Sequence, residues 1–103
     1  MKVIIEEQVR QSILEFYAVS MRLHPALTEE TVMAKIERLT GAMNDLGKHP
    51  FIYADARLKK SWIAAEYKET IVEDFHIAYR VETDENGEQY VAIYDAVHSK
   101  LYY

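Results

Sequence analysis

Residues 75–98 have the sequence FHIAYRVETDENGEQYVAIYDAVH, and this stretch decides the fold. Its first part alternates apolar residues with polar or small ones, which is the period of a β-strand. The apolar set is Phe75, Ile77, Tyr79 and Val81. Residues 84–87, DENG, are typical of a turn, because an Asn-Gly pair can take positive φ. A second alternating run follows, so the sequence predicts a β-hairpin, with Val91, Ile93 and Val97 alternating with Tyr90, Ala92 and Tyr94.

Two further strands are expected outside the hairpin. Residues 66–72 are a candidate third strand that turns at Glu73 and Asp74 before the hairpin begins. Residues 2–5 are short and β-branched, which favours a strand at the N-terminus. Residues 51–64 show neither period and are expected to form a loop that can include a helical turn.

Between these strands the apolar residues recur at helical spacing. The first helix is expected to end at His24-Pro25, and the positions that recur on one of its faces are Val9, Ile13, Phe16, Tyr17, Ser20 and Leu23. The second begins after an N-cap at Thr28 and ends near Gly47, with a stripe of Val32, Ile36, Leu39, Met43 and Leu46. Gly41 costs this helix roughly 1 kcal/mol relative to alanine and is expected to let the first helix approach closely.

These elements predict an α+β fold of order β-α-α-β-β-β. The helical hairpin would pack on one face of a small, mostly antiparallel sheet, in a single domain spanning residues 1–103. The other face would carry His76, Arg80, Tyr90 and Tyr94, unless another segment covers it.

Composition limits the classes of function. The chain has 103 residues and a formal net charge of -5, which argues against a protein whose whole surface binds nucleic acid. It has no cysteine, which excludes disulfides and thiolate chemistry. No signal peptide and no stretch near the roughly 20 apolar residues of a membrane span are recognisable, so a cytoplasmic protein without membrane contact is expected. No phosphate loop, dinucleotide fingerprint or metal-ligand spacing is present, so no cofactor and no metal are expected.

One group of residues could carry chemistry. His76 and Arg80 share a face of one strand, while His98 and Lys100 lie at the end of the next. With the nearby tyrosines they could hold a phosphate backbone and stack bases, and a histidine beside a cation could cleave RNA by acid–base catalysis. The alternative is that these are the polar residues of a half-buried sheet, and that the C-terminal tyrosines anchor the chain end.

Four stretches of the chain resemble the RelE/ParE superfamily, the toxins of bacterial type II toxin–antitoxin (plasmid stabilisation) modules. Residues 1–5, running into the first helix, are similar to the ParE branch, and Leu46 with His49-Pro50 resembles the family's close of its second helix. Residues 75–81 and 93–100 resemble its last two strands. The likeness covers nearly the whole chain.

The resemblance implies roles for individual residues. In an mRNA endoribonuclease of this family, the catalytic set would be His98, Lys100, Tyr102 and Tyr103. Substrate would be held by Lys68, His76 and Arg80, with His76 at the position of the family's strand arginine. Here Glu66 and Glu69 stand in a strand that is rich in lysine in the family's ribonucleases.

Three functions remain open. The chain could be a toxin that cleaves ribosome-bound mRNA, or a ParE-like toxin that binds DNA gyrase without chemistry of its own. The acidic charge favours the second. The third is a non-toxic protein-binding domain with the same fold. The expected partners are a cognate antitoxin and either the ribosome with mRNA or gyrase, and a homodimer is a further expectation.

Overall fold

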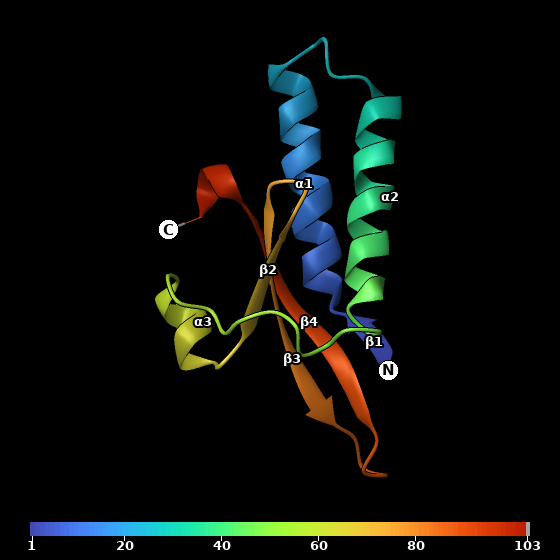
Figure 1. Ribbon diagram of the computed structural model, residues 1–103. Helices are drawn as coiled ribbons and strands as arrows, with labels where there is room; N and C mark the ends of the chain where they lie inside the picture. The colour runs from blue at the N-terminus through green and yellow to red at the C-terminus, as the bar shows by residue number, and fades with distance from the viewer. Residues whose placement is uncertain (103) are drawn as a thin grey trace.

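The computed structural model describes residues 1–102 and confirms the predicted α+β fold (Figure 1). Its elements are β1 (Lys2–Ile5), α1 (Glu7–Leu23), α2 (Glu29–Asp45), α3 (Lys60–Ala64), β2 (Lys68–Val72), β3 (Phe75–Thr83), β4 (Gln89–His98) and the 3-10 helix η1 (Ser99–Leu101). The four strands form one sheet in the order β1-β4-β3-β2. Strand β1 runs parallel to β4, and the other neighbours are antiparallel.

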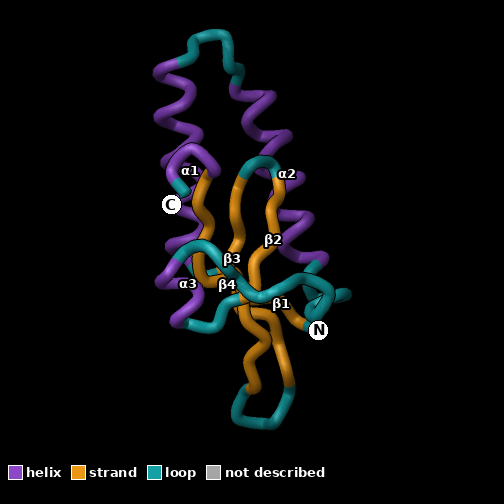
Figure 2. Tube along the Cα trace, turned by 60° about the vertical axis from the view of Figure 1, so that its left-hand side comes forward, coloured by secondary structure: helices purple, strands orange, loops and turns teal. Residues whose placement is uncertain are grey.

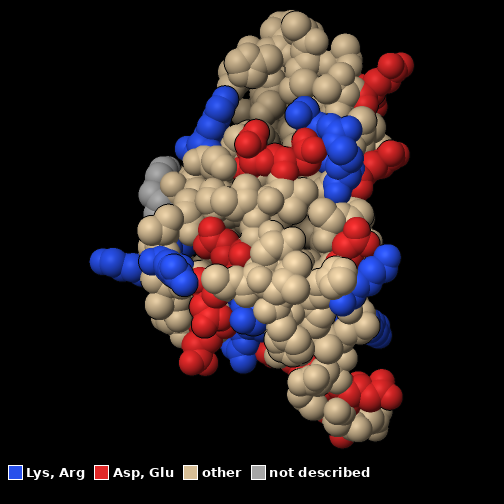
Figure 3. All heavy atoms as spheres, viewed as in Figure 1, with Lys and Arg blue, Asp and Glu red and all other residues tan. Residues whose placement is uncertain are grey.

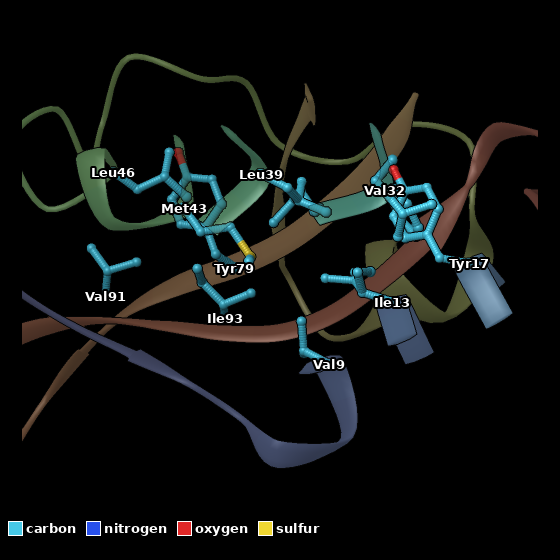
Figure 4. Close-up of a cluster of buried hydrophobic side chains, with 13 residues drawn as sticks. Val9, Ile13, Tyr17, Val32, Leu39, Met43, Leu46, Tyr79, Val91 and Ile93 are labelled. Carbon is cyan, nitrogen blue, oxygen red and sulfur yellow. The ribbon is translucent and has the colours of Figure 1, made fainter. Parts of the chain in front are cut away.

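The helical hairpin covers one face of the sheet, as the sequence predicts. The N-cap at Thr28 is present, and its hydroxyl accepts a hydrogen bond from the backbone N–H of Thr31 at 3.2 Å. The core lies between helices and sheet, where Val9 and Ile13 of α1 and Leu39 of α2 meet Tyr79 and Ile93 (Figure 4). The helical hairpin and the β3–β4 hairpin extend toward opposite ends of an elongated molecule of 48 × 26 × 21 Å (Figures 1 and 2).

The opposite face of the sheet, here called the outer face, is not open. Residues 51–64 were expected to form a loop with a helical turn, and they include the short helix α3, which lies across this face (Figure 1). A second apolar cluster forms there from Ala56, Trp62 and Ala78, with Tyr67, Val97 and Tyr102 packed around it. The sheet is therefore covered on both sides.

A β-bulge in β4 changes which side chains face the helices. Ala78 pairs with Asp95 and Tyr79 pairs with Ile93, so Tyr94 is the extra residue. Before the bulge, Val91 and Ile93 face the helices, but after it Ala96 takes that side. Val97, expected to share a face with Val91 and Ile93, instead packs into the outer cluster. A bulge shifts the alternation by one residue, which is why the uninterrupted period fails here.

The glycines in and after α2 do not have the expected roles. A Cβ on Gly41 would meet no atom within 4 Å, so this glycine does not serve a close approach of α1. Gly47 follows the C-cap Leu46, but it does not have positive φ. A Cβ there would instead collide with the carbonyl oxygen of Met1 and press on Val3. Gly47 is therefore a point of close approach between the end of α2 and β1.

Both predicted turns of the sheet are confirmed. Glu73 and Asp74 connect β2 to β3 with positive φ of 51° and 65°. In the β3–β4 turn, Gly87 has φ of 81°. The Asp84 carboxylate closes this second turn by accepting the backbone N–H groups of Asn86 and Glu88.

Candidate functional site

The residues singled out in the sequence lie on both faces of the sheet. His76 and Arg80 are on its outer side, where Tyr102 joins His76 from beyond η1. Lys68 lies on the edge strand β2, directly opposite Tyr79, which faces the helices. His98 is on the opposite face, toward α1, because the bulge moves it there. The expectation that His76 and His98 form one group is therefore wrong. Tyr103 lies outside the described residues.

Glu69, His76 and Tyr102 form a compact set of contacts, here called the Glu69 cluster. The His76 Nδ1 lies 2.7 Å from one carboxylate oxygen of Glu69. The Tyr102 hydroxyl donates to the other oxygen at 2.8 Å. The Tyr102 ring lies flat on the imidazole, with ring centroids 3.7 Å apart and planes 4° from parallel. The side chains of His76 and Glu69 are only 12% and 14% exposed.

Local structure explains how this cluster forms. The tight turn at residues 73–74 places Ile71 opposite His76, and Glu69 is the diagonal neighbour of His76 on the same face. The 3-10 helix η1 then turns the chain end over the sheet, so that Tyr102 reaches His76 and also contacts Trp62. Burial, followed by the hydrogen bond to Glu69, raises the pKa of Tyr102 to about 12. Tyr102 therefore stays protonated near neutral pH and remains a donor to Glu69.

Glu69 is the functional candidate that sequence reasoning missed. In the sequence, Glu69 stands out only as an acid in a strand that is rich in lysine in the family's ribonucleases. Glu73, in the β2–β3 turn, pairs instead with Lys35 and Arg38 of α2 at 3.6 and 2.8 Å. The Glu69 side chain is mostly buried and faces His76. The signal was available, because pairing residues across the predicted turn places Glu69 diagonally from His76 on one face.

The other candidate substrate-binding residues also have carboxylate partners. The Lys68 Nζ lies 3.2 Å from Asp55. The Arg80 guanidinium lies 3.0 Å from Glu82 and donates to the carbonyl oxygen of Ala65 at 3.2 Å. With His76 beside Glu69, each candidate substrate-binding residue on β2 and β3 thus has an adjacent carboxylate. The positive charge expected for a phosphate-binding surface is cancelled there.

His98 has a different environment. Its ring stacks on Phe16 with centroids 4.0 Å apart and meets the edge of Phe75 at 5.2 Å. Its Nδ1 accepts the backbone N–H of Lys100 at 3.2 Å, which caps η1. Burial is the largest cause that lowers the pKa of His98, while the nearby Asp74 opposes it. In this position His98 is a packing and capping residue rather than a partner of His76.

A groove runs beside His98, between α1 and the end of β4. It has a volume of about 700 Å³ and is lined chiefly by apolar side chains, including Phe16, Val19, Leu23 and Leu101. Lys100 and His98 also line it. The structure thus separates the predicted catalytic residues: His98 and Lys100 line this groove, while Tyr102 belongs to the Glu69 cluster.

Comparison of the chain with models of known protein families and with curated proteins gave no match. Within residues 1–102, no helix has the length and apolar character that crossing a membrane requires. The same residues contain no group of three or more His, Asp or Glu side chains arranged to hold a metal ion.

Proposed function

We propose that this chain is the toxin of a type II toxin–antitoxin module with a RelE/ParE-like fold, and that it arrests growth in the cytoplasm by binding a protein target such as DNA gyrase. Two lines support this proposal. The motifs of residues 1–5, 46–50, 75–81 and 93–100 resemble that superfamily. The order of elements, with a helical hairpin on one face of the sheet, is the one that the hydrophobic periodicity predicts, and that arrangement itself resembles the superfamily.

The pairing of the candidate substrate-binding residues with carboxylates carries the choice of a protein target over mRNA. A phosphate group that approaches Lys68, His76 and Arg80 meets a carboxylate beside each of them. Such a surface gives little long-range attraction to RNA, and the net charge of -5 weakens it further. RNA would also have to displace Tyr102 to reach the imidazole of His76.

The ribonuclease alternative has a further difficulty at His98. Catalysis would need this imidazole to exchange protons with RNA, but its ring is stacked on Phe16 and its Nδ1 accepts the backbone N–H of Lys100, which leaves only Nε2 for that exchange. Binding of a protein target requires neither the ring face nor the Nδ1 of His98 to be free. The proposal includes a cognate antitoxin that neutralises the toxin.

Inducible expression of the chain alone in bacteria tests the proposal. We expect growth arrest, loss of supercoiling by purified gyrase in the presence of the purified chain, and intact ribosome-bound mRNA. The double variant His98→Ala/Lys100→Ala should still arrest growth, since no chemistry depends on these residues. Glu85→Gln, in the exposed β3–β4 turn, is the matched control for expression level.

Two results would contradict the proposal in different ways. Unimpaired growth at full expression would remove the toxin and leave a non-toxic protein-binding domain. Cleaved mRNA with the unmodified chain but not with the double variant would establish the ribonuclease instead.

A further inference from the structure

We propose that the free edge of β2 binds an extended, acidic and apolar peptide segment of a partner protein, which adds to the sheet as a fifth strand. The surface consists of Ile71 on β2 with Tyr53, Arg57 and Leu58 of the preceding segment, and is here called the β2 edge site. This proposal does not depend on the proposed toxicity, because it concerns only the binding of a peptide.

The backbone of β2 has hydrogen-bonding groups that no other strand uses. Strand β2 is the last in the order β1-β4-β3-β2, so one of its sides faces away from the sheet. The backbone N–H of Glu69 points to that side, since it donates to the carbonyl oxygen of Ala54 at 3.1 Å. Residues of a strand alternate in direction, so Ile71, two positions further on, also directs its N–H and C=O outward.

Residues 54–56 protect only the first part of this edge. Asp55 forms a β-bridge with Lys68, and the carbonyl oxygen of Ala54 accepts a hydrogen bond from the backbone N–H of Glu69. The pairing does not extend along β2 as far as Ile71. Within residues 1–102, no loop or neighbouring segment forms a backbone hydrogen bond with Ile71. Exposed strand edges are usually shortened, charged or covered, because they pair readily with other chains. The uncovered part at Ile71 carries an apolar side chain that is 59% exposed.

A shallow groove lies beside this uncovered edge. It has a volume of about 520 Å³, and Tyr53, Leu58 and Ile71 supply its apolar lining. Leu58, which is 75% exposed, forms one exposed apolar patch with Tyr53 and Ile71, and it is such a patch rather than a single leucine that indicates a binding surface. In peptides that extend a sheet, the backbone supplies hydrogen bonds and every second side chain enters such a groove. The arrangement therefore fits an extended peptide with alternating apolar residues.

The charges around the groove indicate acidic residues in that peptide. Arg57 lines it, and Lys59 and Lys60 follow in the basic cluster of an otherwise acidic chain. No ion pair involves Arg57 or Lys60 among the residues that the structure describes. Basic side chains project beside α3 in the space-filling view, with acidic side chains adjacent to them (Figure 3). The two carboxylates of the groove are already engaged, Asp55 by Lys68 and Glu69 by His76.

A second copy of this chain fits the β2 edge site less well. A symmetric pairing about Ile71 would bring the same basic side chains of two copies together. Glu73 and Asp74, with positive φ, end the strand two residues later, so few backbone hydrogen bonds could form. A separate acidic segment avoids both problems.

Titration of the labelled protein with a short blocked peptide of alternating glutamate and valine, followed by NMR, tests the proposal. We expect saturable binding with a Kd of about 1 mM or tighter, with the largest amide shifts at Ile71 and Leu58. The same peptide with lysine in place of glutamate should bind at least about tenfold more weakly, since it opposes Arg57. A peptide with proline at its centre should also lose affinity, because it lacks a donor to the edge.

Charge reversal provides the matched variants. Arg57→Glu should weaken the glutamate peptide and strengthen the lysine peptide, each by about tenfold. Arg22→Glu, an exposed charge reversal on α1, should change neither affinity. Absence of amide shifts at millimolar peptide, equal binding of both peptides, or shifts centred away from Ile71 would each overturn the proposal. None of these outcomes bears on growth arrest.

Discussion

Gly41 and Gly47 show how differently two glycines of one region can behave. Gly41 is inside α2 with free space where its side chain would be, so it weakens the helix without serving a contact. Gly47 lies against the backbone of Met1, where no side chain fits. The same residue type is thus a liability at one position and a packing requirement at the other.

This difference predicts opposite effects of the same substitution. Gly41→Ala should raise the free energy of unfolding by about 1 kcal/mol, because alanine has the higher helix propensity and meets no obstacle. Gly47→Ala should lower it, since the added methyl group forces α2 and β1 apart. Urea denaturation of both variants beside the unmodified chain measures the effects. Equal changes of the same sign would contradict the assigned roles.

His98 predicts a pH dependence of stability. Its pKa is lowered in the folded protein, chiefly by burial against Phe16 and Phe75, from an ordinary value of 6.5. As the pH falls through this value, the unfolded chain therefore takes up the proton first. The contribution of His98 is complete above the unfolded pKa and declines as the pH falls toward the folded pKa. His76, Lys35, Asp74 and Lys100 are the other charged or titratable groups acting on the ring.

His98→Phe tests this dependence, because phenylalanine keeps the ring stack but binds no proton. Urea denaturation at about pH 7.5 and about pH 5.5 should show a smaller loss of stability on acidification for the variant than for the unmodified chain. His24→Asn, at an exposed helix end, controls for removal of a histidine. An unchanged or larger loss in His98→Phe would show that His98 does not contribute in this direction.

Among the elements, the short helix α3 has the greatest effect on the outer face. Trp62 is 1% exposed, and its indole N–H donates to the Asp95 carboxylate at 3.0 Å. It thereby attaches α3 to β4 just after the bulge, beside Tyr102. A helix of this length is not stable alone, so its position depends on tertiary contacts, of which the burial of Trp62 is the largest.

Removal of the Trp62 side chain should therefore be costly. Trp62→Ala should lower the free energy of unfolding by about 3–5 kcal/mol, the range for loss of a buried aromatic residue. Trp62→Phe should cost less, because it keeps most of the apolar contact and loses only the donor to Asp95. Ile63→Ala, at the neighbouring half-exposed position, should change stability by less than about 1 kcal/mol. Thermal and urea denaturation measure these values, and a similar cost at Trp62 and Ile63 would contradict this role of Trp62.

For the molecule as a whole, charge and shape suggest binding of proteins rather than nucleic acid. Within the net charge of -5, Lys68 and Arg80 are paired with carboxylates, and the basic cluster at residues 57–60 lies beside the β2 edge site. The apolar groove beside His98 and the β2 edge site lie on different elements. The molecule thus has two separate surfaces for the proposed target and for the proposed peptide partner.

The strands, the long helices and their order could be predicted because they depend on local patterns. Alternation in residues 75–81, helical spacing from Val9 to Leu46 and the turn residues at 73–74 and 84–87 act over a few positions. These patterns also placed His76 and Arg80 on one face. The same reasoning could have placed Glu69 beside His76, since a tight turn defines which residues of the two strands are neighbours.

The candidate site depended on contacts between residues far apart in the chain. The bulge at Tyr94 moves His98 to the helix side, and no local signal in an alternating strand specifies an extra residue there. Trp62 meets Asp95, and Tyr102 meets Glu69, across 33 positions in each case. Short-range periodicity specifies the direction of a side chain relative to its own element. Which segment covers that side chain, and which charge neutralises it, depends on how the elements pack together.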